Sequence, residues 1–404
     1  MQTGALEGVR VIEWAEGIAG PFAGRILAGL GAEVVKVEPP GGGDASRRAG
    51  PFRGDVPDRE ASGLFLYLNA GKRGITLDPA RPGGREVFGK LLAGADVLVL
   101  DKPAPALRRW RLGLPGLQRR HPGLVVASVT PFGLEGPYAG FKASDLVTFH
   151  MAGLGFITPR LPPSPDLPPL RAGTPIVGYL AGLNGAAAIG CALLVRELSG
   201  RGQLIDLAEM ECAMFAVAAG VPAYTYEPRV PSRQPAGPPA VAPIALLPTA
   251  DGYFEVQCQE EEHWDGLVGA LGEPEWARWE VFADKGLRGQ NWDALRPLLE
   301  EVTRTVEKAR LFREAQARGV PLAPVNSPRD VVECEHLRVR GFFETVEHPV
   351  AGPVLMPGAL AQLTATPWRA LGPAPLLGQH TTEVLEGLGY SKAELLALRQ
   401  RGAV

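Results

Sequence analysis

The stretch VRVIEWAEGIAGPFAGRILAGLGAEVVKVEPP, residues 9–40, decides the fold. Its first part, VRVIEWA (9–15), is an apolar strand pattern. GPFAGRILAGLG (20–31) has apolar residues at helical spacing, with a proline in the first turn and a glycine as a stop. AEVVKVEPP (32–40) is a second strand, which the two prolines end. This is a βαβ unit, and such units imply a parallel sheet.

The same alternation continues beyond residue 40. GITLD (74–78) and ADVLVLD (95–101) are two more predicted strands, and GGREVFGKLLAG (83–94) is a helix between them. GLVVASVT (123–130) is a further strand. The sequence to about residue 135 therefore predicts an α/β domain built on a Rossmann-like open parallel sheet.

Two proline-rich segments interrupt the rest of the chain, at 158–175 and 227–243. Such segments cannot form helix or central strand, so we expect semi-rigid surface segments. After the second one, IALLPTADGYFEVQC (244–258) is typical of a β-hairpin with its turn at Asp-Gly. It opens a predicted smaller α+β domain. The chain ends in an expected helix at 391–402, with serine as its N-cap.

Composition excludes several classes of protein. The chain has 404 residues, 46% hydrophobic and 21% charged, which is a soluble globular composition long enough for two domains. A net charge of −3 argues against a nucleic-acid-binding protein. Four cysteines lie far apart without C-x-x-C spacing, so we expect neither zinc, nor another metal site, nor a disulfide framework.

The sequence also argues against a membrane protein. The N-terminus has no basic region followed by an apolar core, so no secretory signal is expected. The longest apolar stretch, GLNGAAAIGCALLV (182–195), is too short to span a bilayer and predicts a buried helix. We therefore expect a cytoplasmic protein.

Three cationic turns adjoin predicted strands. They are PPGGGDASRR (39–48), NAGKRG (69–74) and KPAPALRRW (102–110). There is no G-x-G-x-x-G motif and no Walker loop. Ligands collect at strand ends in open α/β sheets, and backbone donors with arginine suit anions. The turns therefore predict a ligand with several phosphates at one edge of the sheet.

The chain resembles the family III CoA-transferases, a group that includes formyl-CoA transferase, crotonobetainyl-CoA:carnitine CoA-transferase and α-methylacyl-CoA racemase. The order of motifs carries the resemblance, above all the glycine-rich start and the GRGQ motif. The matching stretches are 6–44, 68–78, 95–109, 127–139, 196–207, 250–256, 348–358 and 374–391.

The resemblance implies an architecture. A large CoA-binding domain would comprise residues 1–200 and a return segment, 326–404. Residues 201–243 would form a helix and linker, and 244–325 the small domain. Two chains would thread through each other as an interlocked-ring homodimer, and region 227–243 would help to form the acyl pocket.

The resemblance also implies that CoA and acyl-CoA are substrates rather than a permanently bound cofactor. The residues expected to contact CoA come from three turns. Near the thiol and pantetheine lie Glu16, Gly17 and Ala19; near the 3′-phosphate lie Gly71, Lys72 and Arg73; near the adenine and diphosphate lie Asp101, Ala106 and Arg109. Where many relatives have an arginine after the second strand, this chain has proline, so one phosphate contact is in doubt.

The nucleophile of the family is absent. Transferases of this type use an aspartate whose carboxylate attacks the thioester, in a pattern where this chain has TPIVGYLAG and therefore Gly178. The remaining candidates for a catalytic group are Glu16, Asp145 and Glu260. Three hypotheses stay open: CoA transfer between carboxylic acids, racemase-like proton transfer on a 2-methylacyl-CoA, and a catalytically degenerate CoA-binding protein. The racemase would need a histidine where Ser144 stands.

Overall fold

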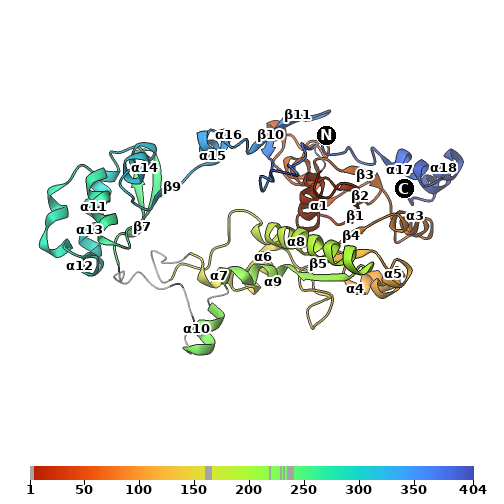
Figure 1. The fold of residues 1–404 in the computed structure, drawn as a ribbon, viewed down its shortest axis with the longest axis horizontal. Helices are drawn as coiled ribbons and strands as arrows, with labels where there is room; N and C mark the ends of the chain where they lie inside the picture. Colours follow the sequence, from red (N-terminus) through yellow and green to blue (C-terminus); the bar gives the residue numbers. More distant parts are fainter. Residues whose placement is uncertain (1–3, 160–165, 218–219, 228–229, 231–232, 234–240) are drawn as a thin grey trace. The chain divides into compact units, whose positions relative to one another are not determined.

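The structure, a computed structural model, describes residues 4–159, 166–217, 220–227, 230, 233 and 241–404. It divides into two compact units (Figure 1). Unit 1 comprises Met1–Thr158, Pro169–Ser232 and Gly341–Val404, and unit 2 comprises Pro159–Pro168 and Arg233–Arg340. Most of the segment 227–243, including the acyl-pocket loop expected there, lies outside the described residues.

Unit 1 is built on a six-stranded parallel sheet with the order β3-β2-β1-β4-β5-β6. This is the strand order of the Rossmann fold, in which ligands bind beyond the carboxyl ends of the strands. The predicted α/β class is therefore confirmed. The strands are β1 (Arg10–Trp14), β2 (Glu33–Glu38), β3 (Arg73–Thr76), β4 (Val97–Leu100), β5 (Val125–Thr130) and β6 (Leu204–Ala208).

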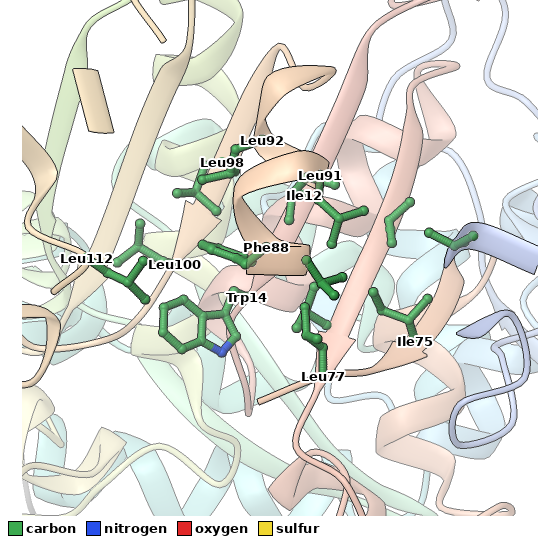
Figure 2. Close-up of a cluster of buried hydrophobic side chains, with 14 of the residues drawn as sticks. Ile12, Trp14, Ile75, Leu77, Phe88, Leu91, Leu92, Leu98, Leu100 and Leu112 are labelled. Atoms are coloured by element: carbon green, nitrogen blue, oxygen red, sulfur yellow. The ribbon is translucent and has the colours of Figure 1, made fainter. Parts of the chain in front are cut away.

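Helices cover both faces of this sheet. On one face, leucines of α1 and α8 pack against valines of the central strands. On the other face, α3 and its neighbours bury the cluster drawn in Figure 2, which includes Trp14 and Phe88. The C-terminal helices α17 and α18 pack on this second face, far in sequence from the strands. The helices on the two faces are α1 (Ala19–Gly29), α3 (Pro82–Ala93), α4 (Ala104–Arg109), α5 (Leu114–Arg120), α8 (Ile176–Ser199), α17 (Thr381–Gly387) and α18 (Lys392–Gln400).

Shorter elements complete unit 1. Helices α6, α8 and α9 pack against one another beside the carboxyl end of β6. The terminal helix begins as expected, because Ser391 caps α18 in a reciprocal capping box with Glu394. The remaining elements are α2 (Gly63–Asn69), α6 (Asp145–Met151), α7 (Leu154–Ile157), α9 (Glu209–Met214), α10 (Gly220–Tyr226) and the hairpin β10 (Phe343–His348) with β11 (Gly352–Pro357).

Helix α8 is longer than the apolar stretch in the sequence suggests. With 24 residues it is long and apolar enough to cross a membrane, but half of its most apolar window is buried inside the protein. That burial is typical of a core helix. Its inner face carries Gly178, Gly182 and Gly185, which lie against α1 and allow a close approach of the two helices.

Unit 2 has its own core, built from a three-stranded antiparallel sheet and helices. The predicted hairpin is confirmed, because β7 and β8 pair up to Thr249 and Gly252 at either side of the turn. The elements are β7 (Ile244–Thr249), β8 (Gly252–Gln257), β9 (Leu322–Pro324), α11 (Glu261–Ala270), α12 (Lys285–Gln290), α13 (Trp292–Thr303), α14 (Lys308–Gln316), α15 (Pro328–Val332) and α16 (Glu335–Val339).

Candidate functional site

A tight turn after β1 lies at the carboxyl edge of the sheet and is held by two carboxylates. The amide N–H of Glu16 donates to Asp101 Oδ2 at 2.8 Å, and that of Gly17 donates to Asp44 Oδ1 at 3.0 Å. Gly17 has a φ of +74°, a left-handed conformation that favours glycine. The backbone from Glu16 to Ala19 is therefore fixed before any ligand binds.

Buried charges below this turn hold Asp44 in place. Lys36 Nζ lies 2.8 Å from Asp44 Oδ2 and 3.0 Å from Glu13 Oε1, and all three side chains are fully buried. Lys36 also donates to the carbonyl oxygen of Ala15 at 3.0 Å. Burial alone would raise the pKa of Asp44, but the ammonium of Lys36 lowers it to about 2. The carboxylate that anchors Gly17 therefore stays ionised.

A second ion pair engages the side chain of Glu16. Lys102 Nζ lies 2.7 Å from Glu16 Oε1 and 3.0 Å from Asp101 Oδ1. Burial raises the pKa of Asp101, and the charge of Lys102 opposes that rise. Glu16, predicted as a catalytic candidate, is therefore neutralised by a neighbouring cation.

The start of α8 faces the same turn. A Cβ placed on Gly178 would lie 3.0 Å from both Cβ and Cγ2 of Ile18, so position 178 is directly opposite the turn after β1. The amide N–H of Gly178 donates to Asp145 Oδ1 at 3.1 Å. Burial raises the pKa of Asp145, while the amide N–H groups of Gly178 and Val177 oppose the rise. The structure thus brings Asp145 and the turn that carries Glu16 to Gly178, the position at which the resemblance leads us to expect the nucleophile.

Glu209 is a carboxylate near this position that the sequence did not single out. It is the first residue of α9, directly after β6 ends at Ala208. In the described part of the chain its side chain has neither a hydrogen bond nor an ion pair. Burial, then the charge of Asp145, then that of Asp101 raise the pKa of Glu209 to about 7. Perturbed carboxylates of this kind concentrate at functional sites. Residues 201–207 did not predict a strand, so nothing in the sequence placed Glu209 at a sheet edge.

The other two turns predicted to hold CoA lie at opposite ends of their strands. Ala106 and Arg109 lie on α4, which follows β4 at the carboxyl edge together with Asp101, and Arg109 is exposed. Gly71, Lys72 and Arg73 precede or begin β3, which runs parallel to β2, so they enter the sheet from its amino side. The expectation that all the cationic turns share one edge is therefore wrong, because β3 begins at Arg73. The role of these three residues toward a phosphate stays a prediction.

Several cations of these turns are engaged within the protein. Lys72 Nζ is buried 2.7 Å from Glu13 Oε2, and it also donates to Asn69 Oδ1 at 2.9 Å. Arg73 is half-buried and pairs with Glu33 at 2.7 Å. Arg47, in the glycine-rich loop after β2, is fully buried. Among these predicted cations, exposed Arg109 is the better placed for a phosphate.

Glu260, the third catalytic candidate, belongs to unit 2, whereas the site residues described above belong to unit 1. It is the N-cap of α11 and forms a capping box with His263. Its exposed carboxylate lies 3.1 Å from Lys285 Nζ. Capping accounts for this side chain without a catalytic role. Among the residues that the structure describes, no group of three or more histidine, cysteine or acidic side chains has the arrangement of a metal site.

The raised pKa of Glu209 predicts a pH-dependent cost in stability. Relative to the unfolded chain, the penalty is absent below a pH near 4.5, grows up to about 7, and is complete above 7. Replacing Glu209 by glutamine is therefore expected to raise the free energy of unfolding by about 2 kcal/mol at pH 8 but not at pH 4.5. Denaturant unfolding at both pH values measures this. Glu211→Gln, an exposed neighbour on α9, is the control, and an equal gain there would contradict the assignment.

Comparisons with known proteins agree with this architecture. The family model for CoA-transferase family III matches residues 6–381. The succinyl-CoA–L-malate CoA-transferase alpha subunit of Chloroflexus aurantiacus is 32% identical over 399 residues, 98% of this chain and 92% of the relative. The succinate–glutarate CoA-transferase of Agrobacterium fabrum is 32% identical over 388 residues, 95% of each chain.

Solved structures give the same result. A CaiB/BaiF family protein from Brucella suis has a TM-score of 0.85 and 31% identity, over 96% of this chain and all of the other. Rv3272 from Mycobacterium tuberculosis has a TM-score of 0.78 and 26% identity, over 95% of this chain and 99% of the other. With a family match across nearly its whole length and relatives above 30% identity, this chain belongs to CoA-transferase family III.

Proposed function

We propose that this protein transfers CoA from an acyl-CoA to a free carboxylic acid, with a dicarboxylic acid as donor or acceptor. The observation that carries the proposal is the full-length similarity to relatives whose names specify CoA transfer between such acids. Succinyl-CoA is therefore the first donor to test. We expect side chains outside the turn after β1 to select the acyl group.

The geometry of unit 1 supports this proposal. The exposed guanidinium of Arg109 follows β4 and is available to the diphosphate of CoA. The turn from Glu16 to Ala19 is fixed by Asp44 and Asp101, so the thioester would meet a preorganised backbone. Position 178 faces that turn. A bound thioester would therefore lie beside the contact between the turn after β1 and the start of α8.

The test is a CoA-exchange assay with succinyl-CoA as donor and glutarate or L-malate as acceptor. We expect a new acyl-CoA that requires the acceptor, measured by chromatography. Arg109→Ala is expected to raise KM for succinyl-CoA about tenfold while kcat changes little, because the contact is made equally in ground and transition states. Arg119→Ala, an exposed arginine on α5, is the matched control.

Other outcomes would contradict transfer. Deuterium uptake at the α-carbon of a 2-methylacyl-CoA in heavy water, without exchange, would identify a racemase. Calorimetric binding of CoA with neither reaction would identify a degenerate binding protein.

We further propose an intertwined homodimer in the cytoplasm. Large apolar side chains are exposed along neighbouring elements of unit 1: Leu198 on α8 is 84% exposed, Phe215 after α9 is 81% exposed, and Tyr226 on α10 is 87% exposed. Exposed apolar side chains on successive elements favour a covering partner, and a second copy of the chain would suit the reach of the proline-rich segments. Sedimentation velocity distinguishes the dimer from a monomer.

A further inference from the structure

We propose that Glu209 supplies the nucleophilic carboxylate that Gly178 cannot supply. The inference rests on the proposed CoA transfer and names the residue that carries it out. CoA transfer through an enzyme-bound acyl group needs a carboxylate, because its anhydride is comparable in reactivity with the thioester. Gly178 has no side chain, and α8 carries no acidic residue before Glu197. The group must therefore come from another element at this edge of the sheet.

Chain topology brings Glu209 to that edge. It follows the last residue of β6, and β6 pairs in parallel with β5 up to the register pair Thr130 and Ala208. Its helix, α9, packs against α8 and α6, which carry Gly178 and Asp145. The charges that act on Glu209 are those of Asp145 and Asp101. Both of these carboxylates are hydrogen-bonded to the backbone around the site, Asp145 to Gly178 and Asp101 to Glu16.

The other nearby carboxylates are already engaged. Glu16 is paired with Lys102 at 2.7 Å. Asp145 accepts the amide N–H of Gly178, and Asp101 accepts that of Glu16 while paired with Lys102. Attack by any of these carboxylates would break contacts that hold the site together. Glu209 has no such contact within the described residues, so its lone pairs are free.

The strand next to β6 ends in a buried hydroxyl. Thr130 is only 2% exposed, and its Oγ1 has no hydrogen-bond partner among the described residues. It is the last residue of β5 and the register partner of Ala208, which precedes Glu209. Native proteins seldom leave a buried hydroxyl unpaired, and each instance calls for a missing partner. Val129, the preceding residue, packs with Ala181 and Cys212 on the α8 side of the sheet, so the Thr130 side chain points to the other face and does not bear on a ligand at Glu209.

The reaction balances with this one residue and the two substrates. The Glu209 carboxylate attacks the thioester carbon; a C–O bond forms, the C–S bond breaks, and CoA leaves as thiolate. The thiolate attacks the Glu209 carbonyl of the anhydride, giving a glutamyl-CoA thioester and the free donor acid. The acceptor carboxylate attacks that thioester, releasing thiolate and forming a second anhydride. The thiolate then attacks the acceptor carbonyl, which yields the new acyl-CoA and restores Glu209.

The environment of Glu209 sets the pH at which it can attack. Burial and the charges of Asp145 and Asp101 raise its pKa to about 7, so the carboxylate is ionised above neutrality. Asp145 on α6, Asp101 after β4 and Cys212 on α9 itself are the titratable groups whose charges couple to Glu209 among the described residues. kcat/KM for succinyl-CoA should therefore rise as the pH increases through 7, with the plateau at higher pH.

The experiment uses the full-length protein and traps the activated Glu209 carboxylate, either as the mixed anhydride or as the CoA thioester. Incubation with succinyl-CoA followed by hydroxylamine converts an activated carboxylate into a hydroxamate, which peptide mass mapping locates. We expect the label on Glu209, dependent on succinyl-CoA. Glu209→Gln should remove the label and lower exchange roughly a thousandfold or more. Glu211→Gln should keep both, and the unfolding midpoint of Glu209→Gln at pH 8 should equal or exceed that of the wild type.

The outcomes separate this inference from the proposed function. A label on Asp145 or Glu16, or exchange that survives in Glu209→Gln, would overturn the assignment of Glu209 and leave CoA transfer standing. Wild-type protein that exchanges CoA without a label on Glu209 would do the same. Absence of both exchange and label in the wild type would overturn the proposed transfer and this inference together.

Discussion

Replacing Lys36 by methionine is expected to lower the free energy of unfolding of unit 1 by about 3–5 kcal/mol. The ammonium lies between two fully buried carboxylates, 2.8 Å from Asp44 and 3.0 Å from Glu13. Methionine fills much of the same volume but leaves the Asp44 carboxylate buried without a counter-charge. Lys72 still pairs with Glu13 at 2.7 Å, so the loss falls mainly on Asp44. Denaturant unfolding at pH 7 measures the effect.

A second readout links this residue to the site. Asp44 anchors the amide N–H of Gly17, so Lys36→Met should also loosen the turn after β1 and raise KM for an acyl-CoA. Arg73→Met is the control for stability. Its ion pair with Glu33 is a third or more exposed on each side, and such pairs contribute about 1 kcal/mol or less. Equal losses in the two variants would contradict the importance of burial.

Acid should act on the same group in the wild type. The pKa of Asp44 is lowered to about 2, below its unfolded value near 4. The stability that it contributes is therefore present above the unfolded pKa and is lost as the pH falls toward 2. This loss should be absent in Lys36→Met, because Asp44 no longer has the cation that lowers its pKa.

Gly182→Ala is expected to destabilise unit 1 by about 3 kcal/mol, although alanine is the better helix former. A Cβ at position 182 would lie 2.6 Å from the carbonyl oxygen of Ala19 and 3.0 Å from Phe22 Cβ. The backbone oxygen cannot move aside, so α8 and α1 must separate. Gly178 lies one turn earlier on the same face of α8, so its distance from the turn at Ile18 should increase as well. CoA exchange should fall together with stability.

Gly190 provides the matched control on the same helix. A Cβ there would meet nothing within 4 Å, so Gly190→Ala should stabilise α8 by about 1 kcal/mol through its higher helix propensity. Both variants replace glycine by alanine, so thermal unfolding separates the cost of the tight helix–helix contact from the gain in helix propensity. If both variants shifted in the same direction, the close contact of α8 with α1 would not be the cause.

Much of the fold was predictable because its signals are local. The strands at 9–15, 32–40 and 95–101 are compact apolar runs, and the structure places β1, β2 and β4 inside them. β6 escaped prediction. Leu204–Ala208 is short and carries Asp206 in its middle, so its sequence pattern does not distinguish it from a loop. Only pairing with β5 makes it a strand.

The resemblance predicts a CoA-contacting turn at Glu16, Gly17 and Ala19 and a nucleophile position at 178. The structure places Gly178 against Ile18 of that turn, and the roles of these residues stay predictions. The predicted contact of Lys72 with CoA stays a prediction, but its burial was not foreseen. Lys72 looked like a phosphate ligand because cationic turns near strands favour anions, but the folded chain buries it against Glu13. Whether a lysine faces solvent or a carboxylate depends on the strand beside it, which sequence neighbours do not reveal.

By itself, the sequence determined the parallel α/β architecture, the family and the absence of an acidic side chain at position 178. Hydrophobic periodicity and turn chemistry act over a few residues, so they can be read without coordinates. Only the tertiary structure decided which carboxylates converge, because Asp101, Asp145 and Glu209 follow different strands or begin different helices. Their shared site arises from the parallel order of β4, β5 and β6, and the raised pKa of Glu209 arises from burial at that edge.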